Sequence, residues 1–304
     1  MTLPRPGWFQ VWMAAIRPRT LPLSMTPVVA ASVLGWVQTG QVRPDVILAA
    51  LVTAVGIQIG TNLHNDAVDG LDGTDDDTRV GPVRVTQQGW LPARTVFRAA
   101  HLTFACAFLA GLYLCILGGW WLLLPGVASI LAGYAYSAGP LPLSRYPFAE
   151  LFVILFFGLV AVGGVAWVYT GTLGLAAVLL GLAVGFPAAA VLMVNNTRDR
   201  EGDARAGRRT LAIVLGRRGA TKAYRFLLLG GVIAALFLAL SDLAYLGAVA
   251  SLACVPLAFR LAEAFRTADD GPAFNRLLAR TSAYTVSLAA AIGLGLVVMR
   301  TAFF

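Results

Sequence analysis

Nine apolar runs limit what this chain can fold into more than any other feature of its sequence. A helix that crosses a bilayer needs about 20 mostly apolar residues. Runs of this kind cover residues 20–39, 45–63, 95–117, 119–137, 149–170, 174–194, 222–240, 243–262 and 278–301. Only 12% of the 304 residues are charged and 58% are hydrophobic, whereas about a quarter of a soluble domain is charged. The sequence therefore predicts an all-α, polytopic membrane protein. Before the first run, Trp8 and Trp12 are four residues apart, which predicts a short interfacial helix within residues 8–19.

The basic residues predict how the runs are oriented. Lys and Arg concentrate in cytoplasmic loops. All but two of the 23 Lys and Arg residues, the exceptions being Arg43 and Arg300, lie at the N-terminus, in the even-numbered connections or at the adjoining helix ends. We therefore expect a cytoplasmic N-terminus, an external C-terminus and long cytoplasmic connections at 64–94, 138–148, 195–221 and 263–277. The net charge of +8 is interpreted as this topological signal, and no nucleic-acid partner is predicted. The three cysteines lie inside apolar runs and predict neither a disulfide nor a metal site.

An acidic cluster begins where the second run ends. Residues 62–84, NLHNDAVDGLDGTDDDTRVGPVR, hold six of the chain's 15 acidic residues. Residues three and four apart share a helix face. The spacing therefore predicts that four polar side chains project together, namely Asn62, Asn65, Asp66 and Asp69. Two arginines follow them, Arg79 and Arg84.

A second cluster, MVNNTRDREGDARAGRRTLAIVLGRR at 193–218, follows four runs later and so faces the same compartment. It repeats the first in outline. An Asn is followed four residues later by an Asp and then by a further Asp, and a basic tail comes next. The shared-face residues here are Asn195, Asn196, Asp199 and Asp203, and the tail contains Arg205, Arg208 and Arg209.

Carboxylates crowded at a low-dielectric boundary repel one another unless cations lie among them. Oxygen ligands without a His or Cys pattern favour a hard ion such as Mg²⁺, which usually bridges one or two carboxylates to substrate phosphates. Arginines add bidentate phosphate contacts. The two clusters together therefore predict a site that grips a diphosphate.

The acidic clusters have three other interpretations. A single acidic loop is often only solvated, but two loops of the same pattern on one side favour a site. The segment DGLDGTDDD resembles a Ca²⁺ loop, yet it lacks the closing glutamate and leaves the second cluster without a role. An ion-coupled transporter is the alternative from another class, since intramembrane carboxylates mark ion paths. Transporter charges lie near the midplane, however, and these clusters lie at the ends of runs.

The motifs resemble those of the UbiA superfamily of intramembrane aromatic prenyltransferases, over nearly the whole chain. Four segments carry the resemblance: WMAAIRPRTLPLSMTPVV at 12–29, the first acidic cluster, YSAGPLPLSRYPFAELFVILFFG at 136–158, and NNTRDREGDARAGRRTLAIVLGRR at 195–218. Within the superfamily, the chain is most similar to the 1,4-dihydroxy-2-naphthoate polyprenyltransferases of menaquinone biosynthesis. It departs from the family at Ala67, where an aromatic residue is frequent, and at Arg208, where lysine is frequent. Ala67 puts an aromatic substrate contact at that position in doubt.

The resemblance implies a single domain over residues 1–304, with about nine transmembrane helices around a central cavity open to the cytoplasmic side. It implies a multi-pass protein of the bacterial cytoplasmic membrane. The implied reaction moves a polyprenyl chain from polyprenyl diphosphate to 1,4-dihydroxy-2-naphthoate, with loss of CO₂ and diphosphate and with Mg²⁺ as cofactor. A related enzyme acting on another acceptor, such as 4-hydroxybenzoate, is the nearest alternative.

The resemblance also implies roles for individual residues. The expected Mg²⁺ ligands are Asp66, Asp69, Asp75, Asp199 and Asp203, of which all but Asp75 are also expected to be catalytic. The expected substrate contacts are Asn62, Asn65, Asn196, Arg79, Arg84, Arg208, Arg17 and Tyr136. Arg17 is either a partner for the acceptor's carboxylate or an interfacial anchor, and Tyr136 is either a substrate contact or an interfacial aromatic. His64 and His101 are interpreted as helix-end and packing residues, and no catalytic base is assigned.

Overall fold

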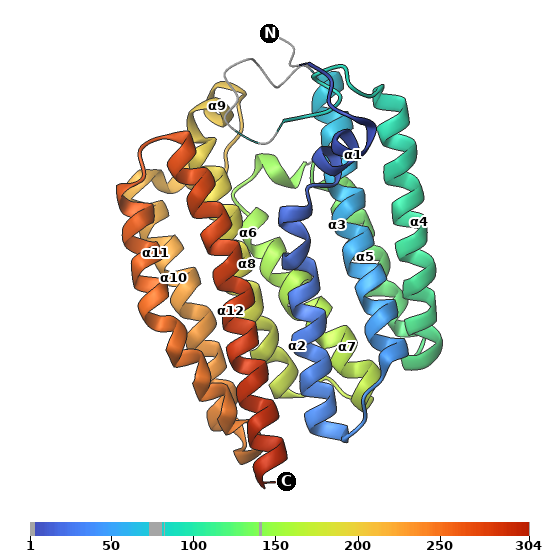
Figure 1. Ribbon diagram of the computed structural model, residues 1–304, viewed down its shortest axis with the longest axis vertical. Coiled ribbons are helices and arrows are strands. Elements are labelled where there is room, and N and C mark those ends of the chain that lie inside the picture. Colours follow the sequence, from blue (N-terminus) through green and yellow to red (C-terminus); the bar gives the residue numbers. More distant parts are fainter. Residues whose placement is uncertain (1–3, 73–80, 82, 140–141, 304) are drawn as a thin grey trace.

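The computed structural model describes residues 4–72, 81, 83–139 and 142–303, and this part of the chain is built from helices (Figure 1). The α-helices are α1 (Trp8–Ile16), α2 (Leu21–Thr39), α3 (Pro44–Asp72), α4 (Ala93–Gly118), α5 (Leu123–Ala135), α6 (Ala149–Val153), α7 (Ala161–Thr170), α8 (Leu175–Arg198), α9 (Arg200–Arg205), α10 (Leu211–Ser241), α11 (Val255–Thr267) and α12 (Gly271–Phe303). A π-helical segment, Ile154–Val160, joins α6 to α7, and a 3₁₀ segment, Leu243–Cys254, leads into α11.

Every predicted apolar run is helical. Eight helical segments in the described residues are long and apolar enough to cross a membrane, and the fourth predicted run forms a shorter apolar helix, Trp120–Ala135. The chain is therefore a multi-pass, all-α membrane protein. The predicted N-terminal helix is α1. It ends at Ile16 and is followed by Arg17, a residue in the left-handed region with φ of 57°.

The helices form two groups with α2, α6 and α7 between them. In Figure 1, α3, α4 and α5 lie on one side, and α8, α10, α11 and α12 lie on the other. The N-terminal end of the chain and α9 lie at one end of the bundle, and the C-terminus lies at the opposite end. Since α3 and α8 both run toward the end that carries α9, their acidic C-terminal residues come to the same end.

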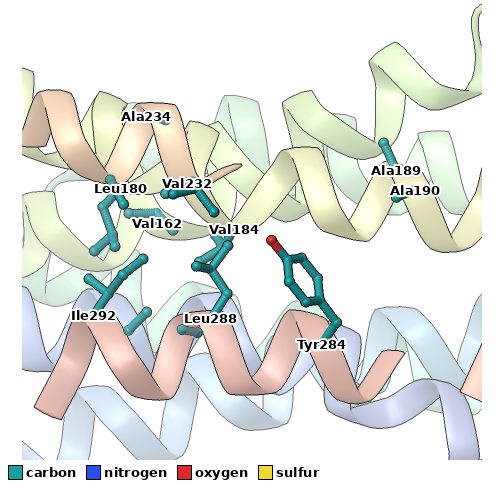
Figure 2. Packing of buried hydrophobic residues seen from close by; sticks show 14 of the residues in the cluster. Val162, Leu180, Val184, Ala189, Ala190, Val232, Ala234, Tyr284, Leu288 and Ile292 are labelled. Atoms are coloured by element: carbon teal, nitrogen blue, oxygen red, sulfur yellow. The ribbon is translucent and has the colours of Figure 1, made fainter. Parts of the chain in front are cut away.

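The main core lies where α8, α10 and α12 meet. Leu180 and Val184 of α8 interlock with Leu288 and Ile292 of α12 (Figure 2), and these four side chains are buried. Tyr284 is fully buried, and its hydroxyl donates to the carbonyl of Leu228 at 3.0 Å. Such dense packing makes this side of the bundle a firm support for the residues at its acidic end.

A smaller core fixes the end of α3. It contains Val11 of α1, Leu63 of α3, Val85 and Trp90 of the following connection, and Val96 of α4. The chain that returns from the first acidic cluster is therefore packed against α3 and does not extend freely into solvent.

Two glycines, Gly247 and Gly295, allow the 3₁₀ segment and α12 to approach each other closely. A Cβ on Gly295 of α12 would overlap the backbone carbonyl of Gly247, and a Cβ on Gly247 would overlap that of Gly295. Small residues permit this kind of close packing between membrane helices. Gly293, two residues earlier, has only ordinary contact at its Cβ position, 3.9 Å from Val33 Cγ2.

We expect Gly295→Ala to lower the thermal stability of the detergent-solubilised protein, because α12 must move away from Gly247. Gly293→Ala is the matched control. Alanine favours a helix by about 1 kcal/mol over glycine, so Gly293→Ala should leave the melting temperature unchanged or raise it. Equal melting temperatures for the two variants would contradict the close packing.

Candidate active site

A cavity of about 1940 Å³ lies between the helices and reaches the end of the bundle that carries both acidic clusters. Ligand pockets for small molecules are typically about 300–1,000 Å³, so this one can hold a long ligand or two substrates. Most of its length is apolar, with side chains such as Val28, Leu114, Phe152, Phe156 and Val286. The residues singled out from the sequence that line it are Arg17, Asn62, Asn65, Asp69, Arg84, Tyr136, Asn195, Asn196, Asp199, Asp203 and Arg208.

The two acidic clusters meet at Arg208. Its Nη1 lies 3.2 Å from Asp203 Oδ1, and its Nη2 lies 4.0 Å from Asp69 Oδ1. Asp69 also forms an ion pair with Arg84, whose side chain is only 4% exposed. Carboxylates from α3 and α9, far apart in sequence, thus share one guanidinium at the polar end of the cavity.

Asp199 is held by its neighbour Arg198. Arg198 donates from Nε to Asp199 Oδ1 at 2.8 Å and from Nη2 to Oδ2 at 2.7 Å. The same guanidinium donates to Asn195 Oδ1 and to Asn275 Oδ1, both at 2.8 Å. Arg198 was not predicted as a site residue, although it directly precedes the motif aspartate at the end of α8.

Asn196 is oriented by Glu150 of α6. Its amide nitrogen donates to Glu150 Oε1 at 2.9 Å, and both side chains are buried. This bond uses one of the two amide hydrogens and leaves the amide oxygen available as an acceptor or metal ligand. Glu150, which was not predicted as a site residue, therefore positions a predicted one.

Asp66 has different surroundings from Asp69, although both were predicted on one helix face. The Asp66 carboxylate is fully buried and accepts three hydrogen bonds: from the backbone N–H of Val85 at 3.1 Å, from that of Thr86 at 3.0 Å and from Thr86 Oγ1 at 2.7 Å. It is not among the residues that line the cavity. Asp66 thus fastens the returning chain to α3, beside the point where Arg84 Nη1 donates to the Asn65 carbonyl at 2.9 Å.

Asn62 joins α3 to the junction of α1 and α2. Its Nδ2 donates to the Ile16 carbonyl at 2.9 Å and to Thr20 Oγ1 at 3.1 Å, and its Oδ1 accepts from Gln58 Nε2 at 3.1 Å. Arg17 lies within that junction and lines the cavity. A non-glycine residue at positive φ is uncommon and stores backbone strain, which persists only where the surroundings hold it. The Asn62 contacts supply that support.

The remaining predicted residues lie as follows. Tyr136 is partly buried on the cavity lining, just after α5. His64 is buried, its Nδ1 is 3.2 Å from Ser137 Oγ, and its ring packs against Phe97 and Tyr134. His101 Nδ1 is 2.6 Å from the Phe97 carbonyl. Neither histidine lines the cavity. Asp75 and Arg79 lie outside the described residues.

The donors at the polar end fit a hard divalent cation that shares its coordination with a ligand. They are carboxylate and amide oxygens, the type that Mg²⁺ prefers. Among the described residues, no group of three His, Cys, Asp or Glu side chains is close enough to hold an ion alone. Any ion held here would therefore complete its shell with water or phosphate oxygens, as Mg²⁺ usually does.

The profile of the UbiA prenyltransferase family matches residues 24–283. The chain belongs to this family. It is 37% identical over 265 residues to 1,4-dihydroxy-2-naphthoate octaprenyltransferase of Mycobacterium tuberculosis, covering 86% of this chain and 88% of that protein. It is 33% identical over 278 residues to the protein of the same name from Escherichia coli, covering 90% of each.

Solved structures of UbiA homologs share the fold. A UbiA homolog from Aeropyrum pernix K1 aligns with a TM-score of 0.66 at 18% identity, covering 93% of this chain and 98% of that one. A UbiA homolog from Archaeoglobus fulgidus bound to DMAPP and Mg²⁺ aligns with a TM-score of 0.62 at 15% identity, covering 92% and 99%. The predicted fold class and the resemblance to the UbiA family are confirmed.

In this UbiA protein, Asp66→Ala should detach the returning chain from α3. Two buried N–H groups would lose their acceptor, at about 1–3 kcal/mol each, so we expect lower stability and faster hydrogen exchange at the amides of Val85 and Thr86. Thr86→Val is the control, because it removes only the hydroxyl and should leave the Val85 amide protected. Unchanged exchange at both amides in Asp66→Ala would contradict the assigned contacts.

Proposed function

We propose that the chain transfers a polyprenyl group from polyprenyl diphosphate to 1,4-dihydroxy-2-naphthoate, with release of CO₂ and diphosphate. The observation that carries this proposal is the meeting of both acidic clusters, with Arg208 between them, at one end of a mainly apolar cavity. A charged headgroup and a long apolar tail match such a cavity. The relatives named 1,4-dihydroxy-2-naphthoate octaprenyltransferase support the choice of acceptor.

The polar end is proposed to bind the diphosphate. Asp69, Asp199 and Asp203 would hold Mg²⁺ there, with Asn65 and Asn196 as further oxygen donors, and the bound ion would stabilise the negative charge of the leaving diphosphate. Arg84 and Arg208 would donate to phosphate oxygens as the allylic C–O bond breaks. Asp66 and Asp75 as metal ligands and Arg79 as a phosphate contact remain predictions.

The apolar part is proposed to hold the prenyl chain and to keep water from the allylic carbon as positive charge develops on it. Phe152 and Phe156 line this part, with ring centroids 6.1 Å apart in a stacked arrangement. An aromatic face attracts positive charge, so these rings suit the cationic half of the breaking bond.

The acceptor step balances without a separate base. The ring carbon that carries the carboxylate forms the new C–C bond, and the electron pair of the ring–carboxylate bond returns to the ring as CO₂ leaves. No proton has to be removed from that carbon. Arg17 and Tyr136 line the cavity near the junction of α1 and α2 and after α5. Arg17 is proposed to pair with the acceptor's carboxylate, with interfacial anchoring as its alternative role.

We further propose that the polar end faces the cytoplasm of a bacterial cell, in its cytoplasmic membrane. The distribution of Lys and Arg supports this orientation. The N-terminal end of the chain lies at the polar end of the bundle and the C-terminus at the other (Figure 1).

The acceptor assignment is tested with purified protein in liposomes, Mg²⁺, labelled prenyl diphosphate and a panel of aromatic acids. We expect prenylated product from 1,4-dihydroxy-2-naphthoate, together with labelled CO₂ when the carboxylate carries the label. Product from 4-hydroxybenzoate alone would reject the acceptor. Ion or substrate transport without any product would reject the enzyme class in favour of a transporter.

The diphosphate end is tested by Asp69→Asn, Asp199→Asn and Asp203→Asn. Each should lower turnover by at least about 100-fold, because stabilisation of leaving-group charge is of that size or larger. Asp242→Asn is the matched control at the other end of the bundle, where Asp242 Oδ1 only accepts from the Ala244 N–H. Near-normal turnover in all three site variants, with intact folding, would remove the two-cluster mechanism.

A further inference from the structure

We propose that arginines act as built-in counter-ions for the site's carboxylates and change partner when substrate binds. In this exchange, the diphosphate takes Arg198 and Arg208, and the release of Asp199 and Asp203 makes these carboxylates available to the metal ion. The inference rests on the proposed function and deepens it, because it states how the two ligands of that site depend on each other.

Arg198 is the clearest instance. Its side chain is 2% exposed, and both of its contacts with Asp199 are short and parallel, at 2.8 and 2.7 Å. A fork-to-fork pair of this type is among the stronger ion pairs in proteins. Both carboxylate oxygens of Asp199 accept a hydrogen bond from Arg198. A metal ion that binds Asp199 must therefore compete with Arg198 for these oxygens.

Arg208 repeats the pattern with two carboxylates. It contacts Asp203 at 3.2 Å and approaches Asp69 to 4.0 Å, while Asp69 is also paired with Arg84. Asp69, Asp199 and Asp203, three carboxylates of the cavity lining, therefore each have an arginine partner. Because all of these side chains lie at the cavity's polar end, a diphosphate placed there meets the same arginines.

Competition between an internal and an external cation has a definite thermodynamic consequence. Metal alone must displace an arginine and leave its charge without a partner in a largely buried place, which is costly. Diphosphate alone forms ion pairs with the arginines, but it is then repelled by the carboxylates, which have lost their arginine partners. When both bind, each new charge finds an opposite charge, so metal and diphosphate strengthen each other's binding, and the coupling is reciprocal.

The surroundings of Arg198 suit a change of partner. Its guanidinium also donates to Asn195 and to Asn275, at the ends of α8 and α12. These neutral contacts can hold the Arg198 side chain in place while its ion-pair partner changes from the carboxylate to a phosphate. Asn275 directly follows Phe274 of α12, whose ring centroid lies 5.0 Å from the guanidinium carbon of Arg217. Arg217 also donates to the Phe265 and Ala268 carbonyls at the end of α11, at 2.6 and 2.5 Å.

A purely structural role for Arg198 is the competing explanation, and Arg198→Gln separates the two. Glutamine can keep a hydrogen bond to Asn275 but carries no charge. Counter-ion exchange requires the variant to change the affinities of the two ligands in opposite directions. A structural role changes them in the same direction, because a disordered site loses both.

The experiment uses the full chain in detergent or nanodiscs, with folding checked by size exclusion and thermal unfolding. Mn²⁺, which accepts the same oxygen ligands, is titrated without diphosphate and followed by electron paramagnetic resonance. Farnesyl S-thiolodiphosphate, an uncleaved analogue, is titrated separately in EDTA. Arg198→Gln should bind Mn²⁺ about 10-fold more tightly than the wild type and the analogue at least about 5-fold more weakly, within the range of known coupling strengths.

Two further variants complete the design. Arg198→Lys keeps the charge and should retain Mn²⁺ affinity within about 3-fold of the wild type. Arg276→Gln removes an exposed charge at the same end of α12 and should change neither affinity. A loss of both affinities in Arg198→Gln, or no change in either, would overturn the exchange while leaving the proposed function intact. A wild-type protein that binds neither probe even when Mn²⁺ and the analogue are added together would instead overturn the proposed function itself.

Discussion

The site depends on negative charge being tolerated at the boundary of an apolar bundle. The side chains of Asp69, Asp199 and Asp203 are only 8%, 25% and 13% exposed, and each is paired with an arginine. Burying a carboxylate without a partner is costly, whereas a hydrogen-bonded pair offsets much of that cost. The sharing of Arg208 between Asp69 and Asp203 also ties the end of α3 to α9. Pairing with arginines thus makes it possible to place these carboxylates at the end of the bundle, and it also joins the first acidic cluster to the second.

The division of the bundle follows from this constraint. The densely packed contact of α8, α10 and α12 holds the second cluster (Figure 2), while the smaller core around α1, α3 and α4 holds the first. The cavity lies between these two supports. Its apolar walls lower the local dielectric, which strengthens the interactions of every charge at its polar end. In the proposed function, the same walls would exclude water from the reacting carbon, so one arrangement would serve binding and chemistry.

Much of this architecture could be predicted from local sequence patterns. Membrane helices form all their backbone hydrogen bonds within one segment, so each is recognisable as a long apolar run. The roles of individual polar residues could not be predicted, because they depend on contacts with segments that are distant in the sequence. Helical spacing placed Asp66 and Asp69 on one face, but the hydrogen bonds from Val85 and Thr86 bind Asp66 to a segment about 20 residues on and away from the cavity lining. The contacts of Arg198 with Asn275 and of Glu150 with Asn196 join residues 77 and 46 positions apart. No periodicity encodes such pairs.

The position of the charged groups also explains why the reaction proposed here belongs in a membrane protein. A polyprenyl diphosphate is a lipid with a highly charged head, and moving that head into the bilayer is unfavourable. Placing the carboxylates and arginines at the bundle end lets the head stay at the interface while the tail enters the apolar cavity. Only the allylic carbon then lies at the border between the two regions. In the proposed function, the polar end would stabilise the leaving diphosphate there, and the rings of Phe152 and Phe156, which line the cavity, would stabilise the carbon that loses it. The boundary between the polar and apolar regions, where carboxylates are unfavourable without partners, is therefore also the place where both products of the proposed C–O cleavage would be stabilised.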